Sequence, residues 1–472
     1  MNHLNAVAGT NSGQTGFISV CSQLKGWKPT GRPDPVFISL DWARDEQGRP
    51  VDTLFHAWQR QVDDATTAFI SGKGWVPEAF RNSRGVDVIV HGDVHPDYVH
   101  SPEHHSFSDP PTDLDGRCDP ESLYQRFNPV SLAMRAAPNR FPPDSWVVDA
   151  ALKVFEQQSP GMAYVLLGQP DDTGHAFGAA WDTESRTEGD LARRPQLFCE
   201  HDPLHDMVTR ANPRLFVEPI LDATRDTDVQ FGRLIRGLRR QGALANATVM
   251  VLSDHGMVTC LRGPGAQTQR ELQAATDFYQ LILDANLGTK RTVTPSSICS
   301  MGMLYWRRGK EQVAEAKSRL EEHEAVNPAT GDSRCPWIVV DREEMIEGRE
   351  GILPGELYHR WFVETDSEQT MIWPDLILLA KDGWELPAYG SGIGNLGIPV
   401  PEWMFVGPLY VFTGGHGAFD TQPILMAISR PGDNSGVSER DVRIGDLALT
   451  ARDLFGLELE STTVGQSLID DL

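Results

Sequence analysis

The chain has 472 residues, of which 40% are hydrophobic and 23% charged, and its formal net charge is −24. This length exceeds what one single-core domain usually holds, so we expect a large α/β domain that carries a second, smaller one. So acidic a chain repels duplex nucleic acid, which argues against a duplex-binding protein, and no apolar run approaches the ~20 residues that a membrane-spanning helix needs.

Short, continuously apolar runs predict buried strands, and helical patterns lie between them. The strands are expected at residues 86–90, 162–168, 248–252, 376–380 and 424–428. Apolar positions between 220 and 238 fall on one face of a helix, and those between 447 and 457 suggest another helix. This alternation indicates an α/β fold with a doubly wound, mostly parallel sheet and helices on both faces.

Two stretches interrupt the alternation. Residues 91–143 are rich in Pro, Asp, His and Ser and are interpreted as a long surface loop. Residues 261–399 contain a strand, a helix and a strand, expected at 302–306, 311–324 and 337–341. This pattern predicts an inserted small α+β cap, which we expect to set the choice of substrate. The catalytic core is then expected to comprise residues 1–260 and 400–472.

Three short motifs contain the residue types of a metal site, and two of them directly follow a predicted strand. The five candidate ligands are Asp171, His175, Asp254, His255 and His416. In open α/β sheets, ligands bind beyond the carboxyl ends of the strands. Imidazole and carboxylate are the usual non-thiolate ligands of zinc. Each motif alone is more typical of a surface loop, but the three together predict a site for divalent cations.

In this order the motifs resemble those of the type I phosphodiesterase/nucleotide pyrophosphatase family of the alkaline phosphatase superfamily, and phosphonoacetate hydrolases are similar. The matching stretches are Asp171-x-x-x-His175, Ser253-Asp254-His255-Gly256-Met257 and His416-Gly417. The resemblance implies a metallohydrolase with two divalent ions, expected to be zinc. It implies Asp171, His175 and His416 on one ion, and Asp254 and His255 on the other. The implied substrate is a small phosphodiester, phosphomonoester or phosphonate.

The family's nucleophile is a Thr or Ser that lies three residues before an Asn-His pair. Here Asn2-His3 opens the chain, so the resemblance implies that the nucleophile lies upstream of Met1, and we expect the chain as given to be inactive or incomplete. Thr10, in a glycine-rich stretch, is a weaker alternative nucleophile. Lys73 is a candidate for binding an anionic substrate group, because related phosphonate hydrolases use lysines in this region, although a solvated loop lysine is the commoner interpretation.

Two other classes of protein stay open. One is a catalytically incomplete metal-binding protein that keeps the fold, which the absence of the nucleophile favours. The other is a different superfamily member such as a sulfatase, although the CxPxR-type motif of sulfatases is missing. The first residues carry no basic and apolar signal region, so a cytoplasmic location is expected unless a signal peptide lies upstream. The oligomeric state does not follow from the sequence.

Overall fold

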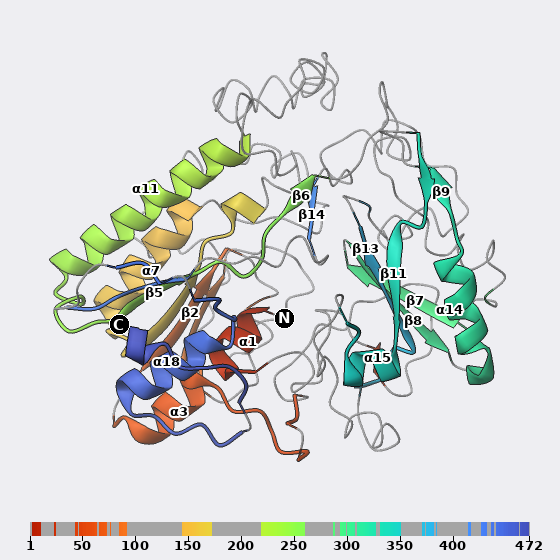
Figure 1. Cartoon of the computed structure of the whole chain (residues 1–472). Helices are drawn as coiled ribbons and strands as arrows, with labels where there is room; N and C mark the ends of the chain where they lie inside the picture. Colours follow the sequence, from red (N-terminus) through yellow and green to blue (C-terminus); the bar gives the residue numbers. More distant parts are fainter. Residues whose placement is uncertain are drawn as a thin grey trace.

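A computed structural model shows the described residues arranged as two groups of elements (Figure 1). One group surrounds a parallel sheet and the other is built on an antiparallel sheet. The structure describes residues 2–10, 23–24, 43–45, 47–63, 66–72, 76, 85–91, 144–171, 219–259, 287, 293–298, 300–306, 309–326, 331–350, 371–372, 374–381, 384, 414–416, 426–431, 436–438, 440–461 and 463–471.

Within the described residues, the parallel sheet has three strands in the order β3-β2-β4. These are β3 (Val88–His91), β2 (Thr67–Ser71) and β4 (Met162–Leu166). The central strand pairs on both sides, so that Phe69 lies opposite Ile89 in β3 and Tyr164 in β4. All five residues of β2 are buried, which is what a strand covered on both faces requires. Strand β2 is not among the strands predicted from the apolar runs.

Helices cover both faces of this sheet, because successive side chains of a strand point in opposite directions. Ala68 and Ile70 pack on one side against α7 (Asp144–Gln158) and α11 (Pro219–Arg240). Phe69 packs on the other side against α1 (Asn2–Ala8) and α3 (Leu54–Gln61). Helix α18 (Asp446–Phe455) in turn packs against α1 and α3. The helices predicted around 220–238 and 447–457 therefore form as α11 and α18.

Two pairs of strands next to this sheet run antiparallel. Strand β5 (Val249–Leu252) pairs with β15 (Met426–Ser429), and β6 (Val258–Thr259) pairs with β14 (Gly414–Gly415). The strand expected at 424–428 therefore forms as β15, and it runs antiparallel to β5, as single strands of a mostly parallel sheet can. The exposure of β15 alternates along the strand, as it does when one face is covered and the other is open to water.

The antiparallel unit is built on a four-stranded sheet in the order β11-β13-β8-β7. Its strands are β7 (Val293–Ile298), β8 (Met301–Trp306), β11 (Trp337–Asp341) and β13 (Leu376–Ala380). Its helices are the 3-10 turn η3 (Lys310–Gln312), α14 (Val313–Glu321) and α15 (Arg342–Glu347). The strand, helix and strand expected at 302–306, 311–324 and 337–341 form here as β8, η3 with α14, and β11.

Strand β13 corrects one prediction. Residues 376–380 form the expected buried strand, but it runs antiparallel to both of its neighbours. A continuously apolar run indicates only that both faces of a strand are covered, and it carries no information on strand direction. The core of this unit packs Leu304, Trp337 and Leu378 around Leu320 of α14.

Short strand pairs complete the described elements. One pair joins β1 (Gln23–Leu24) to β12 (Met371–Ile372), and the other joins β9 (Ala325–Val326) to β10 (Ser333–Arg334). The last described element is a 3-10 turn, η6 (Ile469–Asp471).

Among the described helices, none is long and apolar enough to cross a membrane. The loop predicted at 91–143 lies outside the described residues beyond its first position.

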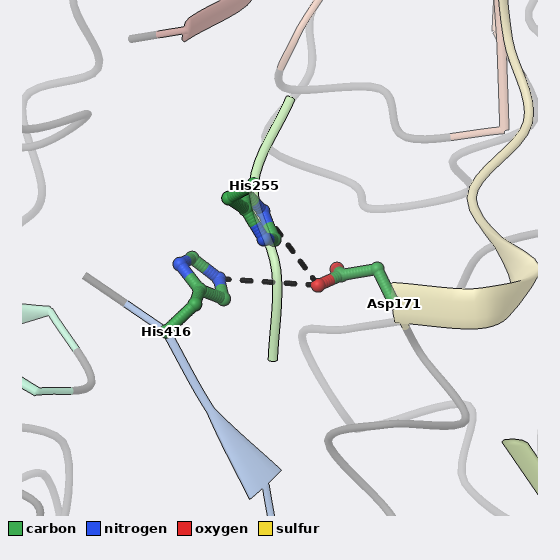
Figure 2. Close-up of side chains that lie close together, drawn as sticks. All are labelled: Asp171, His255 and His416. Atoms are coloured by element: carbon green, nitrogen blue, oxygen red, sulfur yellow. Dashed lines mark ion pairs between the residues drawn. The ribbon is translucent and has the colours of Figure 1, made fainter. Parts of the chain in front are cut away.

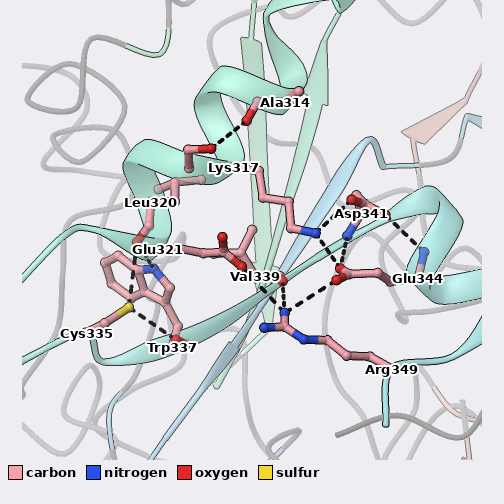
Figure 3. Close-up of polar contacts among 11 residues, drawn as sticks. Ala314, Lys317, Leu320, Glu321, Cys335, Trp337, Val339, Asp341, Glu344 and Arg349 are labelled. Atoms are coloured by element: carbon pink, nitrogen blue, oxygen red, sulfur yellow. Dashed lines mark hydrogen bonds and ion pairs between the residues drawn. The ribbon is translucent and has the colours of Figure 1, made fainter.

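A polar network fixes α14, β11 and α15 to one another (Figure 3). Lys317 of α14 lies 2.8 Å from the Asp341 carboxylate and 2.7 Å from the Glu344 carboxylate. Asp341 ends β11 and caps α15, because its side chain accepts from the backbone N–H of Glu344 at 3.0 Å. Glu344 returns the contact by accepting from the Asp341 N–H at 3.1 Å, which completes a capping box. The unit is thereby held together by charge as well as by its apolar core.

Candidate metal centre

Asp171 is positioned by the turn that follows β4. Gly168 and Gln169 donate their backbone N–H groups to Oδ1 of Asp144, at 2.9 and 3.1 Å. Asp144 begins α7 and is buried, and its other carboxylate oxygen accepts from the hydroxyl of Thr227 on α11. This carboxylate therefore ties the carboxyl end of β4 to two helices and fixes the direction in which Asp171 leaves the sheet.

His255 and His416 are brought together by strand pairing. Asp254 and His255 follow β5, and the chain then enters β6, whose Val258 lies opposite Gly415 of β14. His416 comes directly after β14, so the antiparallel register places it beside the residues before β6. The two imidazole rings stack with centroids 3.7 Å apart and an interplanar angle of 19°.

The two histidines and Asp171 converge on one point (Figure 2). Nε2 of His255 lies 3.8 Å from Oδ1 of Asp171, and Nε2 of His416 lies 3.9 Å from the same oxygen. One ligand atom from each residue lies within 4.8 Å of the other two. These distances are too long for hydrogen bonds. They suit donors that each lie ~2.0–2.1 Å from a shared ion, which places two ligand atoms up to ~4 Å apart.

The protonation of His255 fits a cation as well as the distances do. Its Nδ1 lies 2.9 Å from the carbonyl oxygen of Gly256, which can only accept, so Nδ1 carries a proton. Its Nε2 faces Oδ2 of Asp254 at 3.2 Å as well as Oδ1 of Asp171. A cation bound at Nε2 would take the place of a proton there and would neutralise the two carboxylates. The donor set therefore fits a divalent cation.

His3 extends the cluster from a helix that sequence reasoning did not include. Its Nε2 lies 3.1 Å from Oδ2 of Asp254, and its Nδ1 lies 3.0 Å from the hydroxyl oxygen of Tyr164 on β4. Removal from water, and next the Asp254 carboxylate, raise the pKa of Tyr164 well above its ordinary value, so the phenol stays neutral. The Asn2-His3 pair was the sequence signal that could have identified this residue.

The structure thus brings four of the five predicted ligands together and mixes the two predicted sets. His255, expected on a different ion from Asp171 and His416, lies with them in one group. His175 and Lys73 lie outside the described residues. Thr10 is described: it is 1% exposed, and its hydroxyl lies 3.5 Å from the side-chain oxygen of Asn5.

A backbone hydrogen bond joins the described part of the antiparallel unit to the cluster. Ser300, in the turn between β7 and β8, donates its N–H to the carbonyl oxygen of His416 at 3.1 Å. The carbonyl oxygen of Ser300 accepts from Ala380 at the end of β13, at 2.8 Å. The hairpin turn is therefore fixed to its own sheet on one side and to a candidate ligand on the other.

The fold and the site define a class of protein. A sheet with helices on both faces and polar side chains gathered just past the carboxyl ends of β4 and β5 is the arrangement of an α/β enzyme whose ligand binds at that edge. The model of the type I phosphodiesterase/nucleotide pyrophosphatase family matches residues 47–397, which is more than half of the chain. The chain therefore belongs to this family, whose members are hydrolytic enzymes, and the predicted family is confirmed.

Solved structures show the same fold at low sequence identity. Human ectonucleotide pyrophosphatase/phosphodiesterase 5 is 14% identical, with a TM-score of 0.50, over 99% of this chain and 85% of that one. Phosphonoacetate hydrolase from Sinorhizobium meliloti 1021, solved with phosphonoacetate, is also 14% identical, with a TM-score of 0.52, over 95% of this chain and 82% of that one. No curated protein sequence matches the chain.

Proposed function

We propose that the chain is a divalent-cation-dependent hydrolase of a small phosphodiester, phosphomonoester or phosphonate, and that the resident cation is zinc. One observation carries the proposal, namely the convergence of Oδ1 of Asp171 with Nε2 of His255 and of His416. One carboxylate with two neutral imidazoles is a typical donor set of catalytic zinc, and it leaves a coordination position open. Family membership supplies the reaction class.

Each residue of the cluster has a distinct task in this proposal. Asp171, His255 and His416 hold one cation, and Asp254, whose Oδ2 lies 3.2 Å from Nε2 of His255, is the candidate ligand of a second. His175 completes the predicted set. A bound divalent cation polarises a phosphoryl oxygen and lowers the pKa of a hydroxyl or water that it binds. Its charge also offsets the repulsion between an anionic substrate and a chain of net charge −24.

The antiparallel unit is the proposed substrate-specificity region. We propose that residues 261–399 form a cap on a doubly wound core made of residues 1–260 and 400–472. The hydrogen bond from Ser300 to His416 supports this division, because it sets the hairpin of the unit beside the candidate metal centre. A small phosphorylated or phosphonate substrate would then contact the core through its phosphorus group and the cap through the remainder.

The nucleophile of the reaction stays a prediction. Thr10 is a poor candidate, because its hydroxyl is buried and it lies seven residues from His3 along α1 and its end, which is ~10 Å at 1.5 Å per helical residue. The hydroxyl of Ser253 donates to the carbonyl oxygen of His255 at 2.9 Å. The engagement of both hydroxyls favours, as a second candidate function, a metal-binding protein that keeps the fold without turnover.

Zinc content and hydrolysis together test the proposal. The purified chain is stripped with EDTA, reloaded with Zn²⁺ and analysed for bound metal, and it is then assayed on p-nitrophenyl phosphate, bis-p-nitrophenyl phosphate and phosphonoacetate. We expect stoichiometric zinc that is lost in His416→Ala, and any hydrolysis of these substrates should be lost with it. The matched control is His323→Ala, at a histidine that stacks on Trp337 in the antiparallel unit. A chain that binds no zinc refutes the proposal, and zinc without any hydrolysis favours the second candidate.

A further inference from the structure

His3 connects the interior of the sheet to the candidate metal centre. The side chain is 8% exposed and contacts two polar groups, Tyr164 through Nδ1 at 3.0 Å and Asp254 through Nε2 at 3.1 Å. Tyr164 is itself fixed, because its ring stacks on Phe69 of the central strand with centroids 4.8 Å apart. A chain of polar contacts therefore runs from the sheet core through His3 to Asp254.

The direction of these hydrogen bonds follows from the chemistry of the groups. An ionised carboxylate can only accept, so Nε2 of His3 must carry the proton that points at Asp254. When the ring is neutral, its lone pair lies on Nδ1 and the hydroxyl of Tyr164 donates to it. The raised pKa of Tyr164 is consistent with a phenol that keeps its proton for this purpose.

Helix α1 holds His3 in this position. Leu4 and Val7 are each 2% exposed in the core beneath the sheet. The helix ends at Gly9, whose φ of +64° is the left-handed conformation that glycine readily adopts at a helix end. The Gly9 carbonyl oxygen accepts from Val464 at 2.7 Å. The histidine is thus anchored by apolar packing along the helix and by a hydrogen bond at its end.

We propose that His3, oriented by Tyr164, is a positioning residue that donates from Nε2 to Oδ2 of Asp254 and so orients this carboxylate toward a divalent cation. The cation in this statement rests on the proposed function, whereas the hydrogen bonds do not. Hydrogen-bonded partners of a ligating side chain typically change metal affinity 10–100-fold when they are removed.

The tautomer of His3 provides a test that needs no cation. Two-dimensional ¹⁵N NMR of the metal-free full chain, assigned with His3→Gln, is expected to show the proton on Nε2 of His3. Tyr164→Phe removes the hydroxyl that lies at Nδ1, so it should shift the ¹⁵N resonance of Nδ1 while Asp254 keeps the proton on Nε2. A proton on Nδ1 in the wild-type chain, or no change in Tyr164→Phe, overturns the inference.

Cobalt binding tests the consequence for the cation. Co²⁺ is titrated into the metal-free chain and followed by its visible spectrum. His3→Leu is expected to weaken binding about 10–100-fold and to change the spectrum. His3→Gln, which keeps an N–H donor, should restore most of the affinity. The matched control is His56→Leu, at a histidine that lies 3.3 Å from Asp52 on α3 and away from the cluster.

The outcomes separate the two proposals. If the wild-type chain binds no Co²⁺ and no Zn²⁺, the proposed function fails, and the tautomer experiment still decides the role of His3. If the wild-type chain binds Co²⁺ and His3→Leu binds it equally well, the positioning role fails while the proposed function stands. An equal loss of Co²⁺ affinity in His3→Gln and His3→Leu would also count against the positioning role, because that role depends on the donated hydrogen bond and not on packing.

Discussion

Replacing Asp144 by Asn should change the pH dependence of folding stability in a predictable direction. Burial, opposed by the hydrogen bonds from Thr227, Gln169 and Gly168, raises the pKa of Asp144 from 3.8 to about 6, and the nearby Asp226 carboxylate adds to the rise. The folded protein therefore keeps a proton on Asp144 between pH 4 and 6, where the unfolded chain has lost it. Stability must then fall as the pH rises through this range, and it levels off above pH 6.

The size of the effect follows from the same values. Each pKa unit of difference between folded and unfolded states corresponds to about 1.4 kcal/mol. The rise from 3.8 to about 6 therefore corresponds to about 3 kcal/mol that ionised Asp144 costs the fold at neutral pH. Asparagine cannot titrate, so Asp144→Asn does not have this pH-dependent contribution to the free energy of unfolding. It keeps the side-chain oxygen that accepts from Gly168 and Gln169.

The assay is urea unfolding of both proteins at pH 4, 5, 6 and 7, followed by tryptophan fluorescence at low concentration, because the pI is near 4.9. The free energy of unfolding of the wild type minus that of Asp144→Asn should decrease by about 2.4 kcal/mol from pH 4 to pH 7, because unfolded Asp144 is already partly ionised at pH 4. Asp453→Asn, at a partly exposed carboxylate of α18, is the control that shows how much an Asp-to-Asn substitution outside the sheet core changes the free energy of unfolding. A difference that is constant with pH, or that grows as pH rises, would refute the reasoning.

Three further substitutions test the packing that positions the site. Gly85→Ala should destabilise the fold by about 1–3 kcal/mol in urea unfolding, since φ is +115° and the added Cβ would lie 2.7 Å from the backbone nitrogen of His56; an unchanged midpoint would contradict this. Phe69→Ala, at a side chain 0% exposed, should cost about 3–5 kcal/mol, and a loss under 1 kcal/mol would show that the sheet core collapses around the gap. Asp341→Ala should lower the free energy of unfolding by about 1 kcal/mol, because α15 loses its N-terminal cap. In a double-mutant cycle with Glu344→Ala, the two losses of unfolding free energy should not add, and additive losses would disprove the reciprocal capping box.

Most helices and strands with a clear local pattern of apolar residues could be predicted from the sequence. Strands β4, β5, β11 and β13 are continuous apolar runs, and α11 has a clear apolar face, so each forms within a few residues of its predicted position. Strand direction was not predictable for β13 and β15, because local periodicity does not specify a strand's partner. Strand β2 was missed because its run of three apolar residues is short.

The candidate site was predictable to the extent that its ligands follow strands. Asp171 follows the end of β4 by five residues, and Asp254 and His255 come shortly after β5, at the kind of strand end where ligand sites lie. His416 depended on the pairing of β14 with β6, which only the coordinates reveal. The proposed role of His3 was harder to predict, because it depends on contacts with Tyr164 and Asp254, which lie more than 150 residues away in the sequence. Contacts at such separation leave no local pattern.

The hydrogen bond between Ser300 and His416 has a consequence for engineering this protein. On the proposed function, loops elsewhere in the antiparallel unit can be exchanged to alter substrate choice, whereas the turn between β7 and β8 is hydrogen-bonded to a candidate cation ligand. A grafted loop that displaces this turn should also displace the backbone of His416, because the two are hydrogen-bonded. On the proposed function, such a graft would change the affinity for the cation as well as the choice of substrate. Chimeras between relatives should therefore join on either side of the turn and leave its backbone intact.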